Sequence, residues 1–409
     1  MSTILQINVV VNWGSTGRIV EDIGILAIDS GWKSYIAFGR YPRPSQSELI
    51  QVGNRWDFYW HILQTRLLDR HGLASKRATM KLISKIEKIH PDIIHLHNIH
   101  GYYLNYPLLI DYLININIPI VWTLHDCWAF TGHCAYFSFS HCEKWKTQCV
   151  NCIIKRSYPE SLLFDHSFYN YIKKKEVFNK ISNLTIVPVS NWLDKLVKES
   201  FLKSFVTKRI YNGIDLEVFK PVNNTNLIRE KYGILNSHYI LGIASVWDNR
   251  KGFQDFLLLR KLLPISISIV LVGLDKERIK NLPEGVIGIV RSENVKELRD
   301  LYSAASVFVN PTREDNFPTT NIEALACGTP VITYNTGGSI EAVSPDTGVI
   351  VEQGDLQQMS ENILSICNNG KNYYQSACRK RAMNFFKKEE RYQEYLDLYN
   401  RLLLGKKQI

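Results

Sequence analysis

The chain has 409 residues, of which 45% are apolar, 22% charged and 11% aromatic, a composition typical of globular proteins and not of disordered or fibrous ones. The net charge is +10, and most of the excess lies in residues 1–220, which hold 26 Lys and Arg against 18 Asp and Glu. No uncharged apolar run approaches the ~20 residues of a membrane span, and the first residues show no secretory leader. We therefore expect a cytoplasmic protein of about two domains.

Short apolar runs that alternate with amphipathic stretches predict parallel sheets built from strand–helix–strand units. A turn-rich stretch from Tyr211 to Asn226 separates two such series and marks a domain boundary. The candidate strands of the first series are 4–11, 34–38, 93–96, 118–124 and 184–189, and those of the second are 239–246, 267–272, 286–290, 307–309, 331–333 and 348–351.

The last part of the chain, from Glu389 to Leu404, has the pattern of one charged, Tyr-containing helix. It comes too late to begin another domain, so we expect it to pack back across the two. We predict an N-terminal domain of residues 1–215, a second domain of residues 216–388, and a C-terminal crossover helix of residues 389–409.

Glycine-containing loops follow the first strand of each series. The first loop holds Gly14 and Gly17, and the second holds Arg250, Lys251 and Gly252. Glycine permits close backbone approach, and free N–H groups at a helix start bind phosphate. Neither loop has the spacing of a dinucleotide-binding fingerprint or a P-loop. A tight turn explains the first equally well, and a solvated charged turn is the alternative for the second.

A third loop, residues 310–318, carries Asp315 and leads into a short helix that carries Glu323 and ends at Gly328. This segment resembles the acid-x7-acid signature of the retaining glycosyltransferases of family 4, which have the GT-B fold. Asp315 stands where the family usually has Glu, and Asn316-Phe317-Pro318 replaces its Gly-Phe-Gly turn. The departure is that of a subtype within the same family.

The resemblance covers essentially the whole chain. Arg250-Lys251-Gly252 is similar to the family's donor-phosphate segment, although Val246 stands where an Arg is usual. The remaining matching segments are Asn212-Gly213-Ile214-Asp215, Gly337-Gly338-Ser339-Ile340-Glu341, Gly14 to Arg18, His95-Leu96-His97-Asn98 and Thr123-Leu124-His125-Asp126. The last three are similar to segments of bacterial members that assemble surface polysaccharides. The resemblance implies two doubly wound Rossmann-like domains that face a central cleft.

The resemblance also implies roles for individual residues. Glu323 would accept the ribose diol of a nucleotide-diphosphate sugar, and Asp315 would hold hydroxyls of the transferred sugar. Lys251 and Arg250 would stabilise the leaving diphosphate, and His125 would lie near the reacting sugar. The expected catalytic residues are His125, Asp315 and Lys251, and the expected donor-binding residues are Gly14, Gly17, Arg250, Lys251, Asp315, Asn316, Glu323, Gly337 and Gly338.

The mechanism that the family implies is transfer on one face of the sugar, in which the departing phosphate helps to deprotonate the acceptor. Asp126 adjoins His125, but neighbouring strand residues face opposite sides, so we assign no carboxylate nucleophile. The sequence holds no Asp-x-Asp motif. We therefore expect no catalytic divalent metal.

Five of the eight cysteines lie between residues 127 and 152. The last two form a C-x2-C knuckle, and two more could complete four thiolates around a structural zinc within an insertion at about residues 127–158. The alternative is that they pack as small buried side chains. The predicted ligands are Cys134, Cys142, Cys149 and Cys152.

These observations predict a hexosyltransferase that extends a lipid-linked or oligosaccharide glycan in bacterial surface polysaccharide, capsule or lipopolysaccharide synthesis. The sequence shows no nucleic-acid-binding motif. Basic clusters such as Lys173-Lys174-Lys175 are either a solvated helix face or a contact with the inner face of the cytoplasmic membrane. Two alternatives remain: a catalytically silent glycan-binding protein of the same fold, and a sugar-nucleotide epimerase of that fold.

Overall fold

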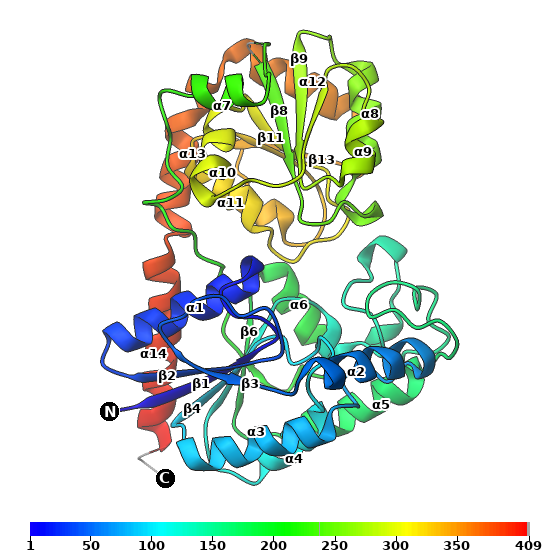
Figure 1. The fold of residues 1–409 in the computed structure, drawn as a ribbon, viewed down its shortest axis with the longest axis vertical. Helices are drawn as coiled ribbons and strands as arrows, with labels where there is room; N and C mark the ends of the chain where they lie inside the picture. Colours follow the sequence, from blue (N-terminus) through cyan, green and yellow to red (C-terminus); the bar gives the residue numbers. More distant parts are fainter. Residues whose placement is uncertain (237, 407–409) are drawn as a thin grey trace. The chain divides into compact units, whose positions relative to one another are not determined.

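The computed structural model describes residues 1–236 and 238–406, which form two units of parallel α/β structure (Figure 1). The first unit comprises residues 1–211 together with the C-terminal helix from Glu389, and the second comprises Asn212–Lys388. Each unit has one sheet with helices on both faces, so the predicted pair of doubly wound domains is confirmed. Among the described residues, no helix is both long enough and apolar enough to cross a bilayer.

The first unit has a seven-stranded sheet in the order β3-β2-β1-β4-β5-β6-β7, and all its strands are parallel. Its strands are β1 (Thr3–Asn8), β2 (Lys33–Phe38), β3 (Glu48–Gln51), β4 (Ile93–Leu96), β5 (Ile120–Leu124), β6 (Leu184–Pro188) and β7 (Val206–Thr207). Its helices are α1 (Gly14–Asp29), α2 (Arg55–Leu68), α3 (Lys76–Ile89), α4 (Tyr106–Ile114), α5 (Ser167–Phe178), α6 (Asn191–Glu199) and α14 (Lys388–Lys406), with short 3-10 turns at Trp128–Phe130, Ser138–Ser140 and Lys144–Lys146.

The central strands of this sheet are buried on both faces, which explains why they are continuous apolar runs. On one face, α1 and α14 pack over β1, β4 and β5, and Figure 1 shows α3 and α4 on the opposite face from α1. The C-terminal helix therefore returns to the first unit, as predicted. Polar contacts hold it there, because Tyr399 Oη lies 2.7 Å from His95 Nδ1 and Thr123 Oγ1 lies 3.1 Å from Tyr395 Oη.

The second unit has a six-stranded parallel sheet in the order β10-β9-β8-β11-β12-β13. Its strands are β8 (His238–Ile243), β9 (Ile267–Val272), β10 (Val286–Ile289), β11 (Val307–Asn310), β12 (Val331–Tyr334) and β13 (Gly348–Val351). Its helices are α7 (Asn226–Lys231), α8 (Phe253–Leu262), α9 (Lys276–Lys280), α10 (Val295–Ala304), α11 (Thr319–Ala326), α12 (Leu356–Asn369) and α13 (Lys371–Phe385), with 3-10 turns η4 (Asn249–Lys251) and η5 (Ser339–Ala342).

The order of strands in the second sheet positions the site. Helices α8 and α12 bury Phe256, Leu259 and Ile363 against the sheet, and α10, α11 and α13 lie on its other side (Figure 1). Strands β8, β11 and β12 are direct neighbours, and parallel strands end at one edge of their sheet. The loops that follow them, residues 244–252, 311–318 and 335–338, therefore meet at that edge.

The segment that enters the second unit and the segment that leaves it are paired with each other. Ile214 N donates to Phe386 O at 2.7 Å, and Lys388 N donates to Ile214 O at 3.1 Å. The Lys388 ammonium also lies 2.7 Å from the Asp215 carboxylate. Both segments are thus held in one two-stranded connection.

Candidate active site

An ion pair forms where two of these loops meet. Lys251 Nζ lies 2.5 Å from Asp315 Oδ2, and the two side chains are 20% and 15% exposed. Asp248 caps the turn η4, since its carboxylate accepts the Lys251 N–H at 3.1 Å. The structure therefore brings together two of the predicted catalytic residues and leaves both within reach of solvent.

Arg250 fastens the Asp315 loop to the same turn. Its Nη1 donates to Glu314 O at 3.0 Å, and its own carbonyl accepts the Arg313 N–H at 2.8 Å. Arg313 in turn forms two hydrogen bonds, of 2.8 and 3.0 Å, with the Asp255 carboxylate on α8. Two arginines and one buried carboxylate thus fix the position of Asp315. Neither Arg313 nor Asp255 was predicted, because no sequence pattern distinguishes them from ordinary surface charges.

The loop after β12 covers the backbone of Asp315. Gly338 N donates to Asp315 O at 3.0 Å, and Gly337 has a left-handed φ of +52°. A Cβ atom on Gly337 would lie 2.0 Å from Asp315 O, which no real contact allows. Only glycine permits this approach, which places the two predicted glycines directly on the acidic loop.

Asn321 connects the start of α11 to strand β11 and to the turn η5. Its Oδ1 accepts from Asn310 Nδ2 at 2.8 Å, and its Nδ2 donates to Ser339 O at 3.0 Å. The residue is fully buried, as is almost all of Asn316. Asn321 was not predicted, because an asparagine in a helix is usually an exposed or capping residue.

Glu323 lies deeper than the ion pair, on α11, and only 2% of it is exposed. Tyr302 of α10 donates its hydroxyl hydrogen bond to Glu323 Oε2 at 2.9 Å. Tyr302 is itself fully buried. The tyrosine fixes the carboxylate in one orientation, and sequence reasoning missed it, since an aromatic residue on an amphipathic helix predicts only core packing.

In the first unit, His125 follows β5 and belongs to a chain of buried polar groups. His125 Nε2 lies 3.1 Å from His97 Nδ1, and His97 Nε2 lies 3.2 Å from Gln6 Oε1. The Gln6 amide is oriented by Nε2, which donates to Val20 O at 2.8 Å. Burial lowers the pKa of His125 to about 4 and holds that of His97 well below its usual value, so both rings are neutral at pH 7.

This chain fixes the proton positions on both rings. Gln6 Oε1 can only accept, so His97 Nε2 carries the proton and His97 Nδ1 carries a lone pair. His125 Nε2 must then donate to His97 Nδ1, which leaves the lone pair of His125 on Nδ1. Gln6 and His97, which were not predicted as site residues, thereby set His125 as a neutral ring with an accepting Nδ1.

Asp126 is committed to a different partner. His100 Nε2 lies 2.9 Å from Asp126 Oδ2, and Trp128 N donates to Asp126 Oδ1 at 2.9 Å. Burial opposes ionisation, but His100 and the Trp128 N–H more than offset it and lower the pKa of Asp126. The carboxylate is therefore ionised and already engaged.

The predicted glycine turn follows β1, and α1 begins at Gly14 with a left-handed φ of +63°. Asn12 N donates to Gly17 O at 3.1 Å, and a Cβ on Gly17 would lie 3.1 Å from that nitrogen. Trp13 stands at the N-cap and contributes no side-chain hydrogen bond to the first turn. The turn is tight, as expected, and the first N–H groups of α1 have no side-chain cap.

The predicted zinc site is not formed. Within residues 1–236 and 238–406, no group of three or more His, Cys, Asp or Glu side chains is arranged so that it could hold a metal ion. One small pocket, lined also by Phe137 and Trp145, does collect all four predicted thiols, those of Cys134, Cys142, Cys149 and Cys152. Apolar burial raises the pKa of Cys149 to about 11 and that of Cys152 to about 12, so these two thiols pack as neutral groups.

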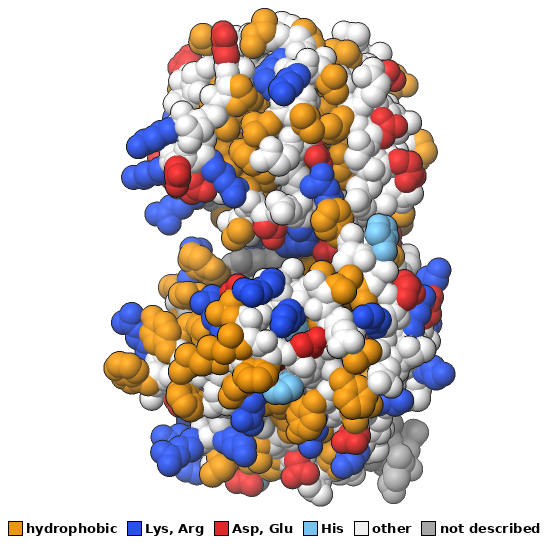
Figure 2. Space-filling model, turned by 90° about the vertical axis from the view of Figure 1, so that its right-hand side faces the viewer, with side chains coloured by type: hydrophobic (Ala, Val, Ile, Leu, Met, Phe, Trp, Pro, Cys, Tyr) orange, Lys and Arg blue, Asp and Glu red, His pale blue; other side chains and the backbone are white. Residues whose placement is uncertain are grey.

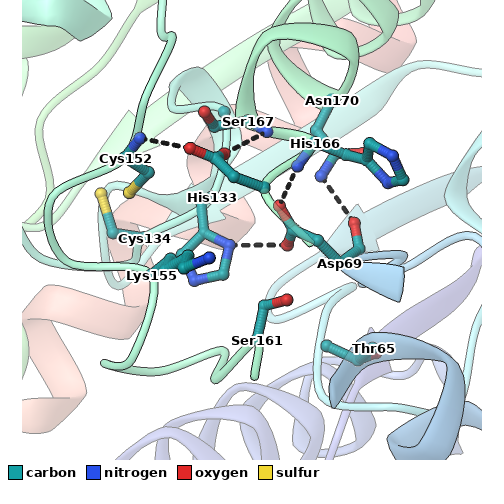
Figure 3. Close-up of polar contacts among 12 residues, drawn as sticks. Thr65, Asp69, His133, Cys134, Cys152, Lys155, Ser161, His166, Ser167 and Asn170 are labelled. Carbon is teal, nitrogen blue, oxygen red and sulfur yellow. Dashed lines mark hydrogen bonds and ion pairs between the residues drawn. The ribbon is translucent and has the colours of Figure 1, made fainter. Parts of the chain in front are cut away.

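Buried polar contacts hold this cysteine-containing segment in place instead (Figure 3). His133 Nδ1 lies 2.6 Å from Asp69 Oδ1, and His166 N donates to Asp69 Oδ2 at 2.9 Å. Cys152 N donates to Asp165 Oδ2 at 2.6 Å. Asp69, at the end of α2 and fully buried, is thus the main anchor of the segment.

The first unit contains five neutral histidines of lowered pKa, and we therefore expect acid to lower its stability. Burial is the first cause of the lowered pKa in each case, and the unfolded chain takes up these protons near pH 6.5. The free energy of unfolding is therefore highest above that pH. It decreases as the pH falls toward the histidine pKa values of the folded state, by at most about 1.4 kcal/mol per histidine per pH unit. The five residues are His61, His71, His95, His97 and His125.

Urea unfolding at about pH 7.5 and about pH 5.5 measures this dependence. We expect a large loss of stability at the lower pH, and a shallower dependence in the His61→Asn variant. His141→Asn, at an exposed position, is the matched control and should leave the dependence unchanged. Equal stability of the wild-type chain at both pH values would contradict the prediction.

Comparisons with known proteins agree with this arrangement. The family model described as Glycosyltransferase Family 4 matches residues 17–218, and that described as Glycosyl transferases group 1 matches residues 237–369. The putative colanic acid biosynthesis glycosyl transferase WcaC of Escherichia coli K12 is 24% identical over 98% of this chain and 100% of its own. A UDP-Gal:alpha-D-GlcNAc-diphosphoundecaprenol alpha-1,3-galactosyltransferase of Escherichia coli is 24% identical over 51% of this chain and 58% of its own.

Two solved structures are similar in fold. Sucrose-phosphate synthase of Thermosynechococcus elongatus gives a TM-score of 0.73 at 18% identity, over 99% of this chain and 100% of its own. Anabaena HepE in complex with UDP and glucose gives 0.69 at 16% identity, over 98% of this chain and 100% of its own.

The two parallel sheets and the loops at the edge of the second one therefore define a glycosyltransferase of the GT-B fold. The matches extend over both units of the chain. The chain belongs to glycosyltransferase family 4, among relatives that act in surface polysaccharide synthesis.

Proposed function

We propose that this glycosyltransferase moves a hexose, with retention of configuration, from a nucleotide-diphosphate sugar to a growing lipid-linked glycan. The observation that carries the proposal is the Lys251–Asp315 ion pair, covered by the Gly337-Gly338 turn. It offers a cation and a carboxylate side by side at the carboxyl edge of a parallel sheet, where such folds bind ligands. The two groups match the two charged or polar halves of the donor, its diphosphate and its sugar.

The ion pair suggests how donor binding prepares the site. A diphosphate carries more negative charge than one carboxylate, so it competes with Asp315 for the Lys251 ammonium. Asp315, released from Lys251 but still held through its backbone by Gly338, can then accept hydrogen bonds from sugar hydroxyls. Lys251 and Arg250 would stabilise the charge that develops on the diphosphate as it leaves, and we expect no catalytic divalent metal.

The nucleoside part of the donor is assigned to Glu323. A carboxylate accepts two adjacent ribose hydroxyls, and Tyr302 holds this one in a fixed orientation. The buried Asn316 and the backbone of Gly337 and Gly338 complete the donor-binding residues of the second unit. The UDP bound to the structurally similar HepE supports a nucleotide-sugar donor for this chain.

The first unit is assigned to the acceptor and to the reacting sugar. His125 is neutral and its ring is oriented by His97, which suits a residue that forms hydrogen bonds beside the reacting sugar. Asp126 is engaged with His100, in line with a mechanism that needs no carboxylate nucleophile. The turn at Gly14 and Gly17 would place uncapped N–H groups of α1 near the anionic part of the donor.

The acceptor and the place of action follow from the relatives. One of them acts, by its name, on a diphosphoundecaprenol-linked sugar, and another takes part in colanic acid biosynthesis. The long apolar chain of such an acceptor would hold it in a membrane, with its polar glycan at the surface. We therefore propose that this chain works in the cytoplasm at the inner face of that membrane, in surface polysaccharide synthesis.

Product analysis with the full chain tests the function. The protein is incubated with each of a panel of sugar nucleotides, with and without a synthetic lipid-diphosphate-linked sugar acceptor. We expect an acceptor-dependent glycan product whose new linkage, analysed by NMR, has the anomeric configuration of the donor. An inverted linkage would refute retention, a new sugar nucleotide formed from donor alone would indicate an epimerase, and binding without any product would indicate a silent glycan-binding protein.

The Glu323→Gln substitution should weaken donor binding by roughly ten- to a hundredfold, because it removes the charge that accepts the ribose diol. Isothermal titration with the donor and with the free nucleotide measures the effect. Tyr302→Phe is the companion variant, because it keeps the Glu323 carboxylate and removes only the hydrogen bond that orients it. Its donor affinity should decrease less. Unchanged nucleotide affinity in Glu323→Gln would contradict the assignment.

A further inference from the structure

Helix α2 of the first unit presents its apolar side to solvent. Trp56 is 82% exposed and Trp60 is 58% exposed, and Tyr59 and Leu63 are also exposed on the same side of the helix. The buried side is polar, because its buried residues are His61 and Thr65. This is the reverse of an ordinary surface helix, which buries its apolar stripe.

The polar side of α2 is attached to the unit by specific hydrogen bonds. His61 Nδ1 lies 2.9 Å from Ser75 Oγ, and Gly72 N donates to His61 Nε2 at 3.0 Å. A capping box at Asn54 and Asp57 fixes the start of the helix. The outward position of the tryptophans is therefore built into the fold and does not result from a loosely held helix.

A second exposed apolar group adjoins the end of α2. Leu162 N donates to Arg66 O at 2.7 Å, and His166 Nδ1 lies 2.7 Å from Leu68 O, so the segment before α5 is tied to α2. The exposed hydrophobic side chains of this segment and of the first turn of α5 are Leu163, Phe164, Phe168 and Tyr169. In Figure 2, hydrophobic side chains gather over the lower body, which is the first unit, with Lys and Arg side chains beside them.

A cationic pocket of about 590 Å³ opens where α2 ends and where α3, α4 and α5 begin. Arg70, Lys76, Lys173 and His166 line it, together with Tyr169 from the exposed apolar group, and its lining contains no Asp or Glu. Of the three consecutive lysines in the sequence, Lys173 faces this pocket. Its neighbour Lys174 is buried and donates to Trp128 O, so that run is not a uniformly solvated helix face.

The charge around α2 and α3 is strongly positive. The described stretch 55–90 carries eight Lys and Arg against three Asp and Glu. Asp57 belongs to the capping box and Asp69 is fully buried, so Glu87 is the one exposed acid of that stretch. An occupant of this surface therefore has to combine negative charge with an apolar layer.

We propose that this surface, composed of the outward side of α2, the exposed residues 163–169 and the cationic pocket, docks on an anionic phospholipid bilayer. Trp and Tyr favour the boundary between headgroups and acyl chains, and Lys and Arg beside them attract anionic headgroups. The pocket takes a lipid phosphate and the aromatic side chains enter the boundary. This docking surface rests on the proposed function, because docking would bring the enzyme to its lipid-linked acceptor.

Vesicle flotation with the full chain tests the proposal without donor or acceptor. We expect binding to vesicles that contain phosphatidylglycerol, weak binding to phosphatidylcholine alone, and loss of binding at high salt. The affinity of the double variant Trp56→Ser, Trp60→Ser for the anionic vesicles should be lower by at least about tenfold. Lys76→Gln, Lys173→Gln should bind more weakly and with a smaller salt dependence.

The controls use exposed residues of the second unit, Tyr373→Ser for the tryptophans and Lys276→Gln for the lysines. Both should bind like the wild type. Absence of wild-type binding to anionic vesicles, equal binding to neutral ones, or full binding by the double tryptophan variant would overturn the proposal. Self-association through α2, detected by sedimentation and abolished by Trp56→Ser, Trp60→Ser, together with no vesicle binding, would assign the surface to a protein contact instead.

Donor-induced thermal stabilisation, measured on the same samples, separates this proposal from the proposed function. Stabilisation by a sugar nucleotide without vesicle binding would leave the transferase function standing and refute the docking surface. Vesicle binding without stabilisation by any sugar nucleotide would do the reverse.

Discussion

Replacing Lys251 with Ala should lower kcat by about 10²–10³, because the role we propose for its ammonium, which pairs with Asp315 in this structure, is to stabilise the charge that develops on the leaving diphosphate. In the free enzyme the Lys251 ammonium already pairs with Asp315, so donor binding only exchanges one anionic partner for another. We therefore expect donor affinity to change less than turnover. Steady-state kinetics with the cognate donor measure both quantities. Transfer by the wild-type chain should persist in the presence of a chelator, since the proposal assigns the diphosphate to side chains.

Lys276→Ala is the matched control for this substitution, because Lys276 is an exposed lysine of the same unit. Its kinetics should equal those of the wild type. Asp315→Asn gives a complementary result, with turnover reduced more than the affinity for free nucleotide. A Lys251→Ala enzyme with nearly normal kcat, or a wild-type enzyme that needs added manganese, would show that Lys251 does not carry the charge of the leaving group.

Replacing Gly337 with Ala should reduce turnover by at least about a hundredfold. The new Cβ would lie 2.0 Å from Asp315 O, so the backbone that carries the acid has to move, and a misplacement of about 1 Å is enough for such a loss. Because φ at this residue is +52°, alanine also adds backbone strain of about 1–2 kcal/mol. Kinetics and the unfolding temperature distinguish the two effects.

Gly233→Ala isolates the strain. Gly233 has a similar φ of +61°, but a Cβ there would meet nothing within 4 Å. We expect this variant to lose a comparable amount of stability and to keep its activity. If Gly337→Ala and Gly233→Ala behaved alike in kinetics, the close approach to Asp315 would have no catalytic importance.

Much of the fold could be predicted because the central strands are buried on both faces and therefore appear as uninterrupted apolar runs. Strands β3 and β7 were not predicted, because they lie at the two edges of the sheet and bury few side chains. In β3 only Ile50 is buried among four residues, and β7 is a pair of residues at the opposite edge of the sheet. An edge strand with one inward side chain leaves almost no hydrophobic pattern in the sequence.

The residues that we assign to the donor could be selected from the sequence because they lie close together in it or match a known signature. Their partners could not. Tyr302 acts on Glu323 from another helix, and Gln6 acts on His125 through His97, across more than a hundred residues of sequence. Such contacts depend on tertiary packing, and the residue types involved are common in cores.

The cysteines and α2 show two other limits of sequence reasoning. Spacing correctly indicated which four cysteines come together, but the geometry and protonation that decide metal binding depend on the surrounding packing. In α2, the positions of Trp56, Trp60 and Leu63 have the period of a helix face, which usually predicts burial. Only the structure shows that this face is turned outward.

The two-stranded connection at Ile214 and Lys388, through which the chain enters and leaves the second unit, has a consequence for biosynthesis. The second unit is one continuous segment, and the contacts of Ile214 with Phe386 and Lys388 close it at its two ends. The first unit is made earlier on the ribosome, yet its core includes Tyr395 and Tyr399 of α14. A nascent chain that stops before residue 389 therefore exposes the part of the first unit's core that α14 covers, and the unit translated first is the one whose core is completed last.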